Sequence, residues 1–174
     1  MPRRDVSVTK VGIVLGSSSD WPIMEPGWRF LEDLKVPTEV IVASAHRTPD
    51  VVREFASSAR ERGLGVIIAV AGAAAHLPGV VASFTTLPVV GVPVSGSALK
   101  GMDALLSIAQ MPSGVPVGTM AIDGGKNAAL YAVSILALSN ETLAKRLLDF
   151  RATQAEEVRE HDRALREKIK KKTK

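Results

Sequence analysis

Five short apolar runs, each followed by a helical segment, constrain the fold of this chain most strongly. The runs cover residues 11–15, 38–43, 66–71, 89–92 and 117–122. Strands of this kind are buried on both faces, and their alternation with helices indicates parallel pairing through βαβ crossovers. The core is aliphatic, because 46% of the residues are hydrophobic and only 4% are aromatic. The pattern therefore predicts a three-layer α/β/α sandwich with a five-stranded parallel sheet.

Helices are expected between these strands and after the last one. They cover residues 21–34, 49–62, 76–83, 99–110 and 126–138. Pro49 suits the first turn of its helix, and Gly63 is a typical C-terminal stop. Pro26 and Gly27 lie inside the first helix, where a proline removes a backbone donor, so a kink or a late start is expected there.

The C-terminal part of the chain differs in character from the rest. From Asn140 towards Lys170 the charges are dense and the apolar positions sparse, so this helix is too long to pack wholly on a small sheet. We expect it to project towards a partner subunit, and the helix at 126–138 also suggests an interface. The chain is interpreted as a single domain over residues 1–174, with a core at about 10–150 and a charged C-terminal helix with a basic tail at 151–174.

Composition excludes several classes of protein. The absence of cysteine excludes disulfides and thiolate metal sites and favours a cytoplasmic location. Residues 1–10 lack the apolar region of a signal peptide, and no apolar run approaches the roughly 20 residues of a membrane helix.

The net charge is +4, and a basic tail can bind nucleic acid. A solvated helix end is favoured instead, because no aromatic residues are interleaved with the basic ones. Small anionic molecules are the expected partners.

The segment GSSSD at 16–20 follows the first strand. Its backbone N–H groups and hydroxyls lie at a helix N-terminus, which favours anions. Asp20 suits a sugar hydroxyl, or it simply caps the helix. The glycine patterns of the Walker and Rossmann loops are both missing.

The segment SAHRTP at 44–49 follows the second strand. Arg47 suits a phosphate or carboxylate through its planar guanidinium, and the imidazole of His46 suits proton exchange near neutral pH. The structural alternative is a histidine that caps local backbone and an arginine paired with a nearby acid.

The segment at 71–79 follows the third strand, and its small residues allow a planar ligand to approach the backbone closely. His76 either binds ligand or caps the next helix. The segment at 110–114 lines the pocket or an interface, with Met111 as a packing residue. No acidic or histidine cluster has metal-ligand spacing and no nucleophile elbow is present, so His46 is expected to work without a metal or a covalent intermediate.

Together these segments resemble PurE, the 5-(carboxyamino)imidazole ribonucleotide mutase family of purine biosynthesis. The matching segments, in order, are GSSSD (16–20), SAHRTPD (44–50), AAHLPG (74–79), LPVVGVPV (87–94), QMP (110–112) and KNAA (126–129). They span residues 10–150, and the loops look like class I, the mutase type. Class II members, which use free carbon dioxide, differ in these loops.

The resemblance implies a flavodoxin-like sheet and a homo-octamer with active sites near subunit junctions. It implies that a carboxylate moves from the exocyclic nitrogen of the imidazole ribonucleotide to the adjacent ring carbon, by decarboxylation and recarboxylation, without a cofactor or metal. His46 is then the general acid/base. The predicted substrate-binding residues are Ser17, Ser19, Asp20, Ser44, Arg47, Gly72, Ala73, Ala74, His76 and Leu77.

Two positions depart from the family pattern. Val70 and Ala73 stand where the family loop usually has glycine, so added side-chain volume beside the ligand is expected to tighten the pocket or to force φ strain. Two other hypotheses stay open. One is reversible carboxylation of aminoimidazole ribonucleotide by free carbon dioxide, and the other is a non-catalytic flavodoxin-like nucleotide-binding module.

Overall fold

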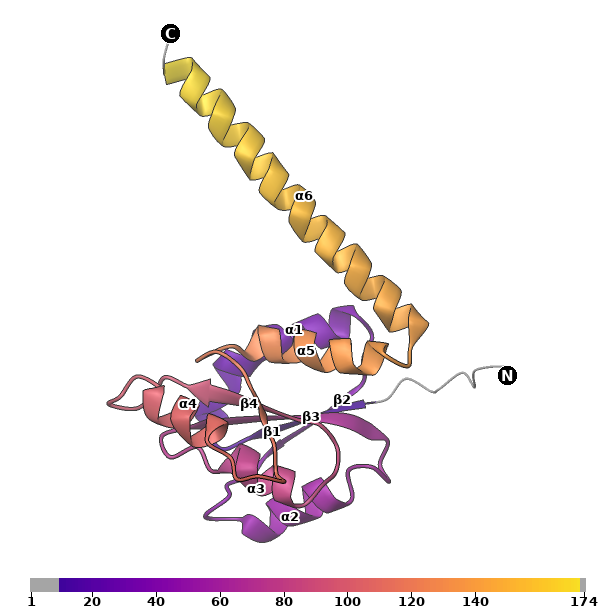
Figure 1. The fold of residues 1–174 in the computed structure, drawn as a ribbon, viewed down its shortest axis with the longest axis vertical. Helices are drawn as coiled ribbons and strands as arrows, with labels where there is room; N and C mark the ends of the chain where they lie inside the picture. Colours follow the sequence, from indigo (N-terminus) through magenta and orange to yellow (C-terminus); the bar gives the residue numbers. More distant parts are fainter. Residues whose placement is uncertain (1–9, 173–174) are drawn as a thin grey trace.

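A computed structural model describes residues 10–172 of the chain and shows a five-stranded parallel sheet between two layers of helices (Figure 1). The strands are β1 (Lys10–Leu15), β2 (Thr38–Val42), β3 (Leu64–Gly72), β4 (Val89–Val94) and β5 (Gly118–Thr119). Their order is β2-β1-β3-β4-β5, which is the flavodoxin-like order. The predicted fold is confirmed. The prediction that residues 1–10 are not a signal peptide concerns a segment that lies almost entirely outside the described residues.

Helices cover both faces of the sheet. One face carries α1 (Trp21–Asp33) and α5 (Gly125–Ala137), and the short 3-10 helix η1 (Ser18–Asp20) leads into α1. The other face carries α2 (Pro49–Ser57), α3 (Leu77–Ser83) and α4 (Met102–Ala109). β3 shows why both faces must be covered, since Ile68 packs on the α1 side and Ile67 on the α2 side, both fully buried.

α1 and α5 approach closely because each contributes a glycine to the contact. A Cβ atom on Gly125 would overlap the carbonyl oxygen of Ile23, and one on Gly27 would overlap the carbonyl oxygen of Gly125. α1 begins at Trp21 and continues through Pro26. The expected late start is therefore wrong, and Gly27 provides space for a neighbouring backbone.

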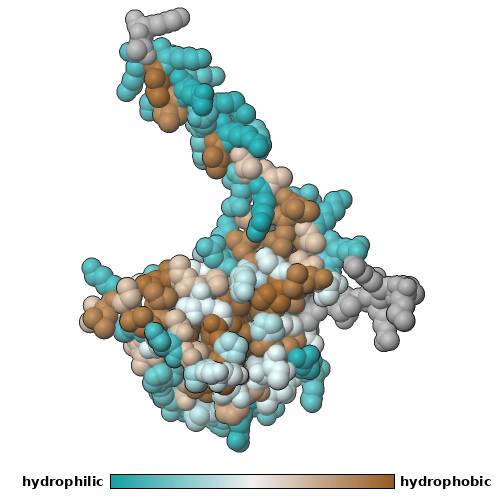
Figure 2. Space-filling model, in the orientation of Figure 1, coloured by the Kyte–Doolittle hydropathy of each residue, from teal (hydrophilic) through white to brown (hydrophobic). Residues whose placement is uncertain are grey.

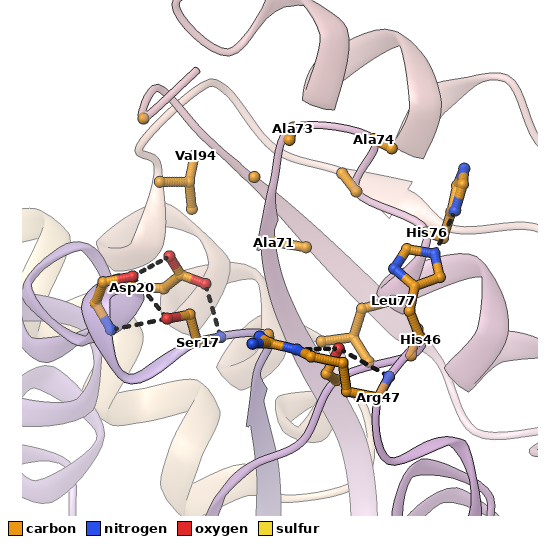
Figure 3. A pocket seen from close by; sticks show the side chains of 17 residues that line it. Ser17, Asp20, His46, Arg47, Ala71, Ala73, Ala74, His76, Leu77 and Val94 are labelled. Carbon is orange, nitrogen blue, oxygen red and sulfur yellow. Dashed lines mark hydrogen bonds between the residues drawn. The ribbon is translucent and has the colours of Figure 1, made fainter.

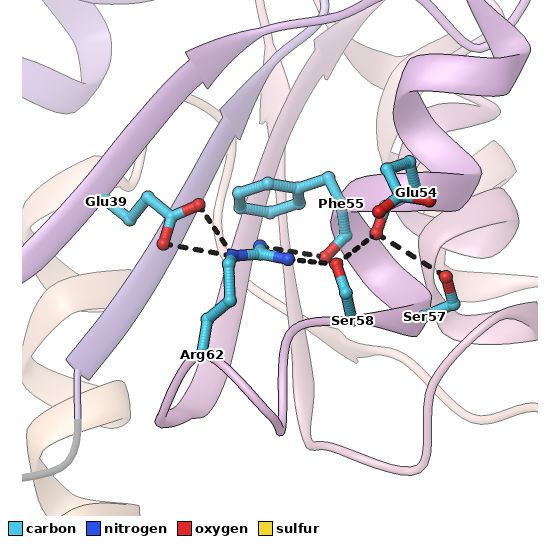
Figure 4. A network of polar contacts seen from close by, with 6 residues as sticks. All are labelled: Glu39, Glu54, Phe55, Ser57, Ser58 and Arg62. Atoms are coloured by element: carbon cyan, nitrogen blue, oxygen red, sulfur yellow. Dashed lines mark hydrogen bonds and ion pairs between the residues drawn. The ribbon is translucent and has the colours of Figure 1, made fainter.

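Several element bounds differ from those predicted. β5 pairs with β4 over only two residues, and α2 ends at Ser57 rather than 62. An Arg62-centred network closes the segment after α2 (Figure 4). The Arg62 guanidinium donates to Glu39 of β2 at 3.0 Å and to the Phe55 carbonyl oxygen at 3.0 Å, and it also contacts Ser58. These bonds tie the end of α2 to the edge strand and hold the turn before β3.

α6 (Glu141–Lys172) leaves the domain after its first turns (Figure 1). Leu143 is buried, the Phe150 ring meets Phe30 at 4.9 Å between centroids, and Arg146 donates to the Leu34 carbonyl oxygen. Every residue from 151 to 172 is exposed. Figure 2 shows hydrophobic and hydrophilic residues interspersed along this projecting part. Among the described residues, no helix is long and apolar enough to cross a membrane.

Candidate active site

A cavity of about 460 Å³ lies where four parallel strands end (Figure 3). This size falls in the usual range for small-molecule sites, about 300–1,000 Å³. The segments that follow β1, β2, β3 and β4 line it, because parallel strands place their carboxyl ends at one edge of the sheet. The lining residues are Gly16, Ser17, Ser19, Asp20, Ser44, Ala45, His46, Arg47, Ala71, Gly72, Ala73, Ala74, Ala75, His76, Leu77, Val94 and Gly96. Every residue predicted for the site from the sequence is among them.

The loop after β1 is organised by a capping box. The Ser17 backbone N–H donates to Asp20 Oδ2 at 3.1 Å, and the Ser17 hydroxyl accepts the Ser19 backbone N–H at 3.3 Å. Asp20 is only 8% exposed, and this burial raises its pKa, while the Ser17 N–H and the Ser19 hydroxyl act to lower it. Asp20 therefore completes the capping box of η1 and also lines the cavity, so the capping interpretation is confirmed and the sugar-hydroxyl interpretation stays a prediction.

Arg47 carries an uncompensated positive charge at the cavity. Its backbone N–H and its Nε donate to the Ser44 hydroxyl, at 3.3 and 3.4 Å. No carboxylate within residues 10–172 forms an ion pair with it, so the alternative of an arginine paired with an acid is wrong. Figure 3 shows the guanidinium extended towards the side of the cavity that holds Ser17 and Asp20. This arrangement suits an anionic group.

Two histidines meet at the opposite side of the cavity. His46 Nε2 lies 2.8 Å from His76 Nδ1, and the rings cross nearly at right angles, with an interplanar angle of 82°. His76 immediately precedes α3, but its side chain makes no capping hydrogen bond. The interpretation of His76 as a helix cap is therefore wrong. The chain's third histidine, His161, lies on the exposed part of α6.

Small residues form the wall between these two polar groups. Ala73 and Ala75 have φ values of 52° and 38°, in the left-handed region that alanine rarely adopts. Such a conformation costs roughly 1–2 kcal/mol for a residue with a Cβ. The expected φ strain at Ala73 is thus present. Val70 instead is fully buried with the α1 and α5 core and lies away from the cavity, so its expected position beside the ligand is wrong.

The predicted site list lacks six lining residues. Four of them, Gly16, Ala45, Ala71 and Ala75, lie within the three segments that the sequence singled out. Val94 ends β4 and Gly96 follows it, and the same strand-end rule identifies both once β4 is extended to Val94. The segment at 110–114 does not line this cavity within one chain. Met111 packs instead on Gly79 of α3, where a Cβ atom would lie 2.9 Å from its sulfur.

Known proteins share both the sequence and the fold. The AIR carboxylase family model matches residues 10–157. A Bacillus subtilis (strain 168) protein named N5-carboxyaminoimidazole ribonucleotide mutase is 55% identical over 152 residues, covering 86% of this chain and 94% of that protein. A Vigna aconitifolia protein named phosphoribosylaminoimidazole carboxylase, chloroplastic, is 52% identical over 159 residues, covering 91% of this chain and 28% of that protein. Among solved structures, Treponema denticola PurE superposes with a TM-score of 0.78 at 27% identity, covering 87% of this chain and 95% of that one.

Proposed function

The chain belongs to the AIR carboxylase family, and we propose that it is the N5-carboxyaminoimidazole ribonucleotide mutase of purine biosynthesis. The enzyme is an isomerase that moves a carboxylate from the exocyclic nitrogen to the adjacent ring carbon of the ribonucleotide. One observation carries the proposal: the residues expected for this site come from three separate strand ends and line a single cavity, to which the end of β4 also contributes.

The two sides of the cavity suit the two ends of the substrate. The Arg47 guanidinium and the Ser17 and Ser19 hydroxyls bind the phosphate, since a planar cation and hydroxyl donors match phosphate oxygens. The Asp20 carboxylate accepts a ribose hydroxyl. The imidazole ring then lies along the alanine wall, with its reacting atoms beside His46.

The chemistry requires one proton to be given and one to be taken. His46 protonates the carbamate nitrogen, the N–C bond breaks with its electron pair retained by the nitrogen, and carbon dioxide is released beside aminoimidazole ribonucleotide. The ring carbon attacks the carbon dioxide, and the proton that it carries passes back to His46. A single imidazole therefore supports both steps and is restored at the end.

Retention of carbon dioxide depends on the wall at 72–75. Its side chains are methyl groups or hydrogen, and Ala75 is buried, so no functional group there competes for the intermediate. A wall of this kind brings the substrate close to the backbone. Positioning of the two fragments against each other supplies much of the rate.

The decisive test replaces the proton-transfer group. His46→Asn is expected to abolish turnover of the carboxyamino ribonucleotide in a spectrophotometric assay while retaining ligand binding, because the phosphate and ribose contacts stay. His161→Gln is the matched control, since it removes the exposed histidine of α6. Wild-type turnover by His46→Asn would contradict the acid/base role, and inactivity of the wild-type protein would reject the mutase.

A second candidate is the carboxylase reaction with free carbon dioxide, which the name of the Vigna aconitifolia relative favours. Turnover in the presence of labelled bicarbonate separates the two reactions. Little label in the product is expected for direct transfer within the cavity. Full exchange of label would identify the carboxylase instead.

We further propose that the enzyme is a cytoplasmic homo-octamer with active sites near subunit junctions. Exposed apolar side chains support an assembly: Leu99, Met102 and Leu106 are 64%, 51% and 51% exposed, and they lie at and beside α4, where Figure 2 shows hydrophobic residues at the left of the domain. Light scattering tests the subunit number directly, and a monomer at micromolar concentration would reject the octamer.

A further inference from the structure

We propose that His76 is a positioning residue that sets which nitrogen of His46 carries a proton. This inference rests on the proposed function, because it assigns His46 the proton-transfer role. It differs from the sequence-based expectation that His76 contacts substrate. The structural basis is the direct pairing of the two imidazole rings.

The pairing leaves one nitrogen of His46 for chemistry. His46 Nε2 faces His76 Nδ1 at 2.8 Å. Among the described residues, no other hydrogen bond engages either ring, so His46 Nδ1 remains available to a substrate in the cavity. The other charged side chains lining the same cavity are Asp20 and Arg47, and neither contacts the imidazoles through a hydrogen bond or ion pair within residues 10–172.

A hydrogen bond between two neutral imidazoles has one proton between the facing nitrogens. If His46 Nε2 carries that proton, His46 Nδ1 is bare and accepts a proton from the substrate carbon; the Nε2 proton then moves to His76 Nδ1, and the exposed His76 ring releases its Nε2 proton to solvent. If His76 Nδ1 carries it, His46 Nδ1 bears the other proton and donates it to the carbamate nitrogen; the His76 Nδ1 proton then moves to His46 Nε2, and His76 Nε2 takes up a proton from solvent. The two arrangements match the two halves of the proposed reaction, and both keep the His46 ring in the same position.

Loss of this partner should alter proton transfer more than binding. His76→Phe keeps a flat ring beside His46 and removes the nitrogen that faces it. We expect kcat to fall about ten- to hundred-fold, by analogy with loss of the partner that orients a metal-bound histidine, with KM changed less than threefold. His76→Asn retains a donor and an acceptor near the Nδ1 position, so it should keep more turnover than His76→Phe. His161→Gln is the control and should match the wild type.

The tautomer itself is read by NMR of protein labelled with ¹⁵N in its histidine rings. The chain has three histidines, so the His76→Phe and His161→Gln variants assign all three rings. The ¹⁵N signals of His46 should change their protonation pattern in His76→Phe and stay unchanged in His161→Gln. A purely structural role of His76 would not move this readout.

Each outcome decides the proposal. A fall in kcat together with a changed His46 tautomer supports it. Unchanged His46 signals overturn it, and so does a rise in KM at constant kcat, which would make His76 a substrate-binding residue. If the wild-type protein fails to turn over the substrate, the proposed function fails, whereas the His46 signals still decide whether His76 sets the tautomer. If His76→Phe does not fold, the same comparisons are made with His76→Asn.

Discussion

The contact between α1 and α5 and the edge that forms the cavity use their residues in opposite ways. At the helix contact, glycines stand where two backbones touch, so the packing is complementary. At the cavity edge, an arginine lacks an acidic partner within residues 10–172, an aspartate is buried, and two alanines take a left-handed conformation. The helix contact contributes stability, whereas the cavity edge retains features that lower stability and suit a ligand.

The largest change, a loss of stability against unfolding, is expected at the helix contact. Gly125→Ala should destabilise the protein by about 3 kcal/mol or more, because its Cβ would overlap the Ile23 carbonyl oxygen and backbone cannot move aside as a side chain can. Denaturant unfolding at fixed protein concentration measures the change. Gly96→Ala is the control, since its nearest neighbour would be Val94 Cγ1 at 4.0 Å. Equal stability of the two variants would remove the basis of the comparison.

Next in size is the effect of Arg47→Ala, which should appear in ligand affinity and not in stability. Loss of a charge-assisted contact to phosphate should weaken affinity by about 1.5–3 kcal/mol, or roughly 10- to 150-fold. Stability should be unchanged within about 0.5 kcal/mol, because no ion pair within residues 10–172 is lost. Calorimetric titration with the ribonucleotide product measures the affinity, and parallel unfolding curves measure the stability. Unaltered affinity would contradict the phosphate role of Arg47.

Asp20→Asn should weaken ligand binding. Its free energy of unfolding at neutral pH should be unchanged or higher by less than about 1 kcal/mol, because a neutral amide avoids the burial of a charge and still accepts the Ser17 N–H. Burial raises the Asp20 pKa above its ordinary value of 3.8. A raised folded-state pKa favours folding below the unfolded pKa, and this contribution is lost as pH rises through the folded pKa. Any stability advantage of the variant should therefore shrink as the pH is lowered towards 3.8. If the stability advantage of Asp20→Asn over the wild type grew on acidification, the pKa of Asp20 would be lowered and not raised.

The smallest effect is expected at Ala73, where glycine relieves the left-handed conformation. The gain of roughly 1–2 kcal/mol is offset by the larger entropy of an unfolded glycine, about 0.4–1 kcal/mol. Ala73→Gly should thus stabilise by about 0.5 kcal/mol. Ala74→Gly is the matched control and should destabilise slightly, because Ala74 has no positive φ. Thermal unfolding of the pair tests the sign, and the same sign in both variants would argue against strain at Ala73.

The strands of the fold were predictable because each is a continuous apolar run bounded by turn residues. β5 was overestimated, since its strand pairing with β4 is confined to Gly118 and Thr119, followed by one backbone hydrogen bond from the Met120 N–H to the Gly91 carbonyl oxygen. The role of Gly27 was not predictable, because its contact is Gly125, about a hundred positions away along the chain. Local rules could only mark Pro26 and Gly27 as helix breakers.

The candidate site was predictable wherever one strand-end rule applied. Ser17 and Ser44 follow strands and Gly72 ends one, and their loops meet at one edge. The pairing of His46 with His76 was not predictable, since it depends on how the loops after β2 and β3 reach across the intervening β1. The strand-end rule alone placed both histidines at this edge, while the ring-to-ring contact needed coordinates.

The straight exposed part of α6 also determines where a reporter can be attached. Residues 151–172 rise about 33 Å along the helix axis at 1.5 Å per residue. The first turns of α6 are fixed to the domain through Leu143, Arg146 and Phe150. A fluorophore near residue 172 therefore lies far from the domain on a helix whose first turns are fixed to it. A small rotation of the domain then produces a large displacement of the dye.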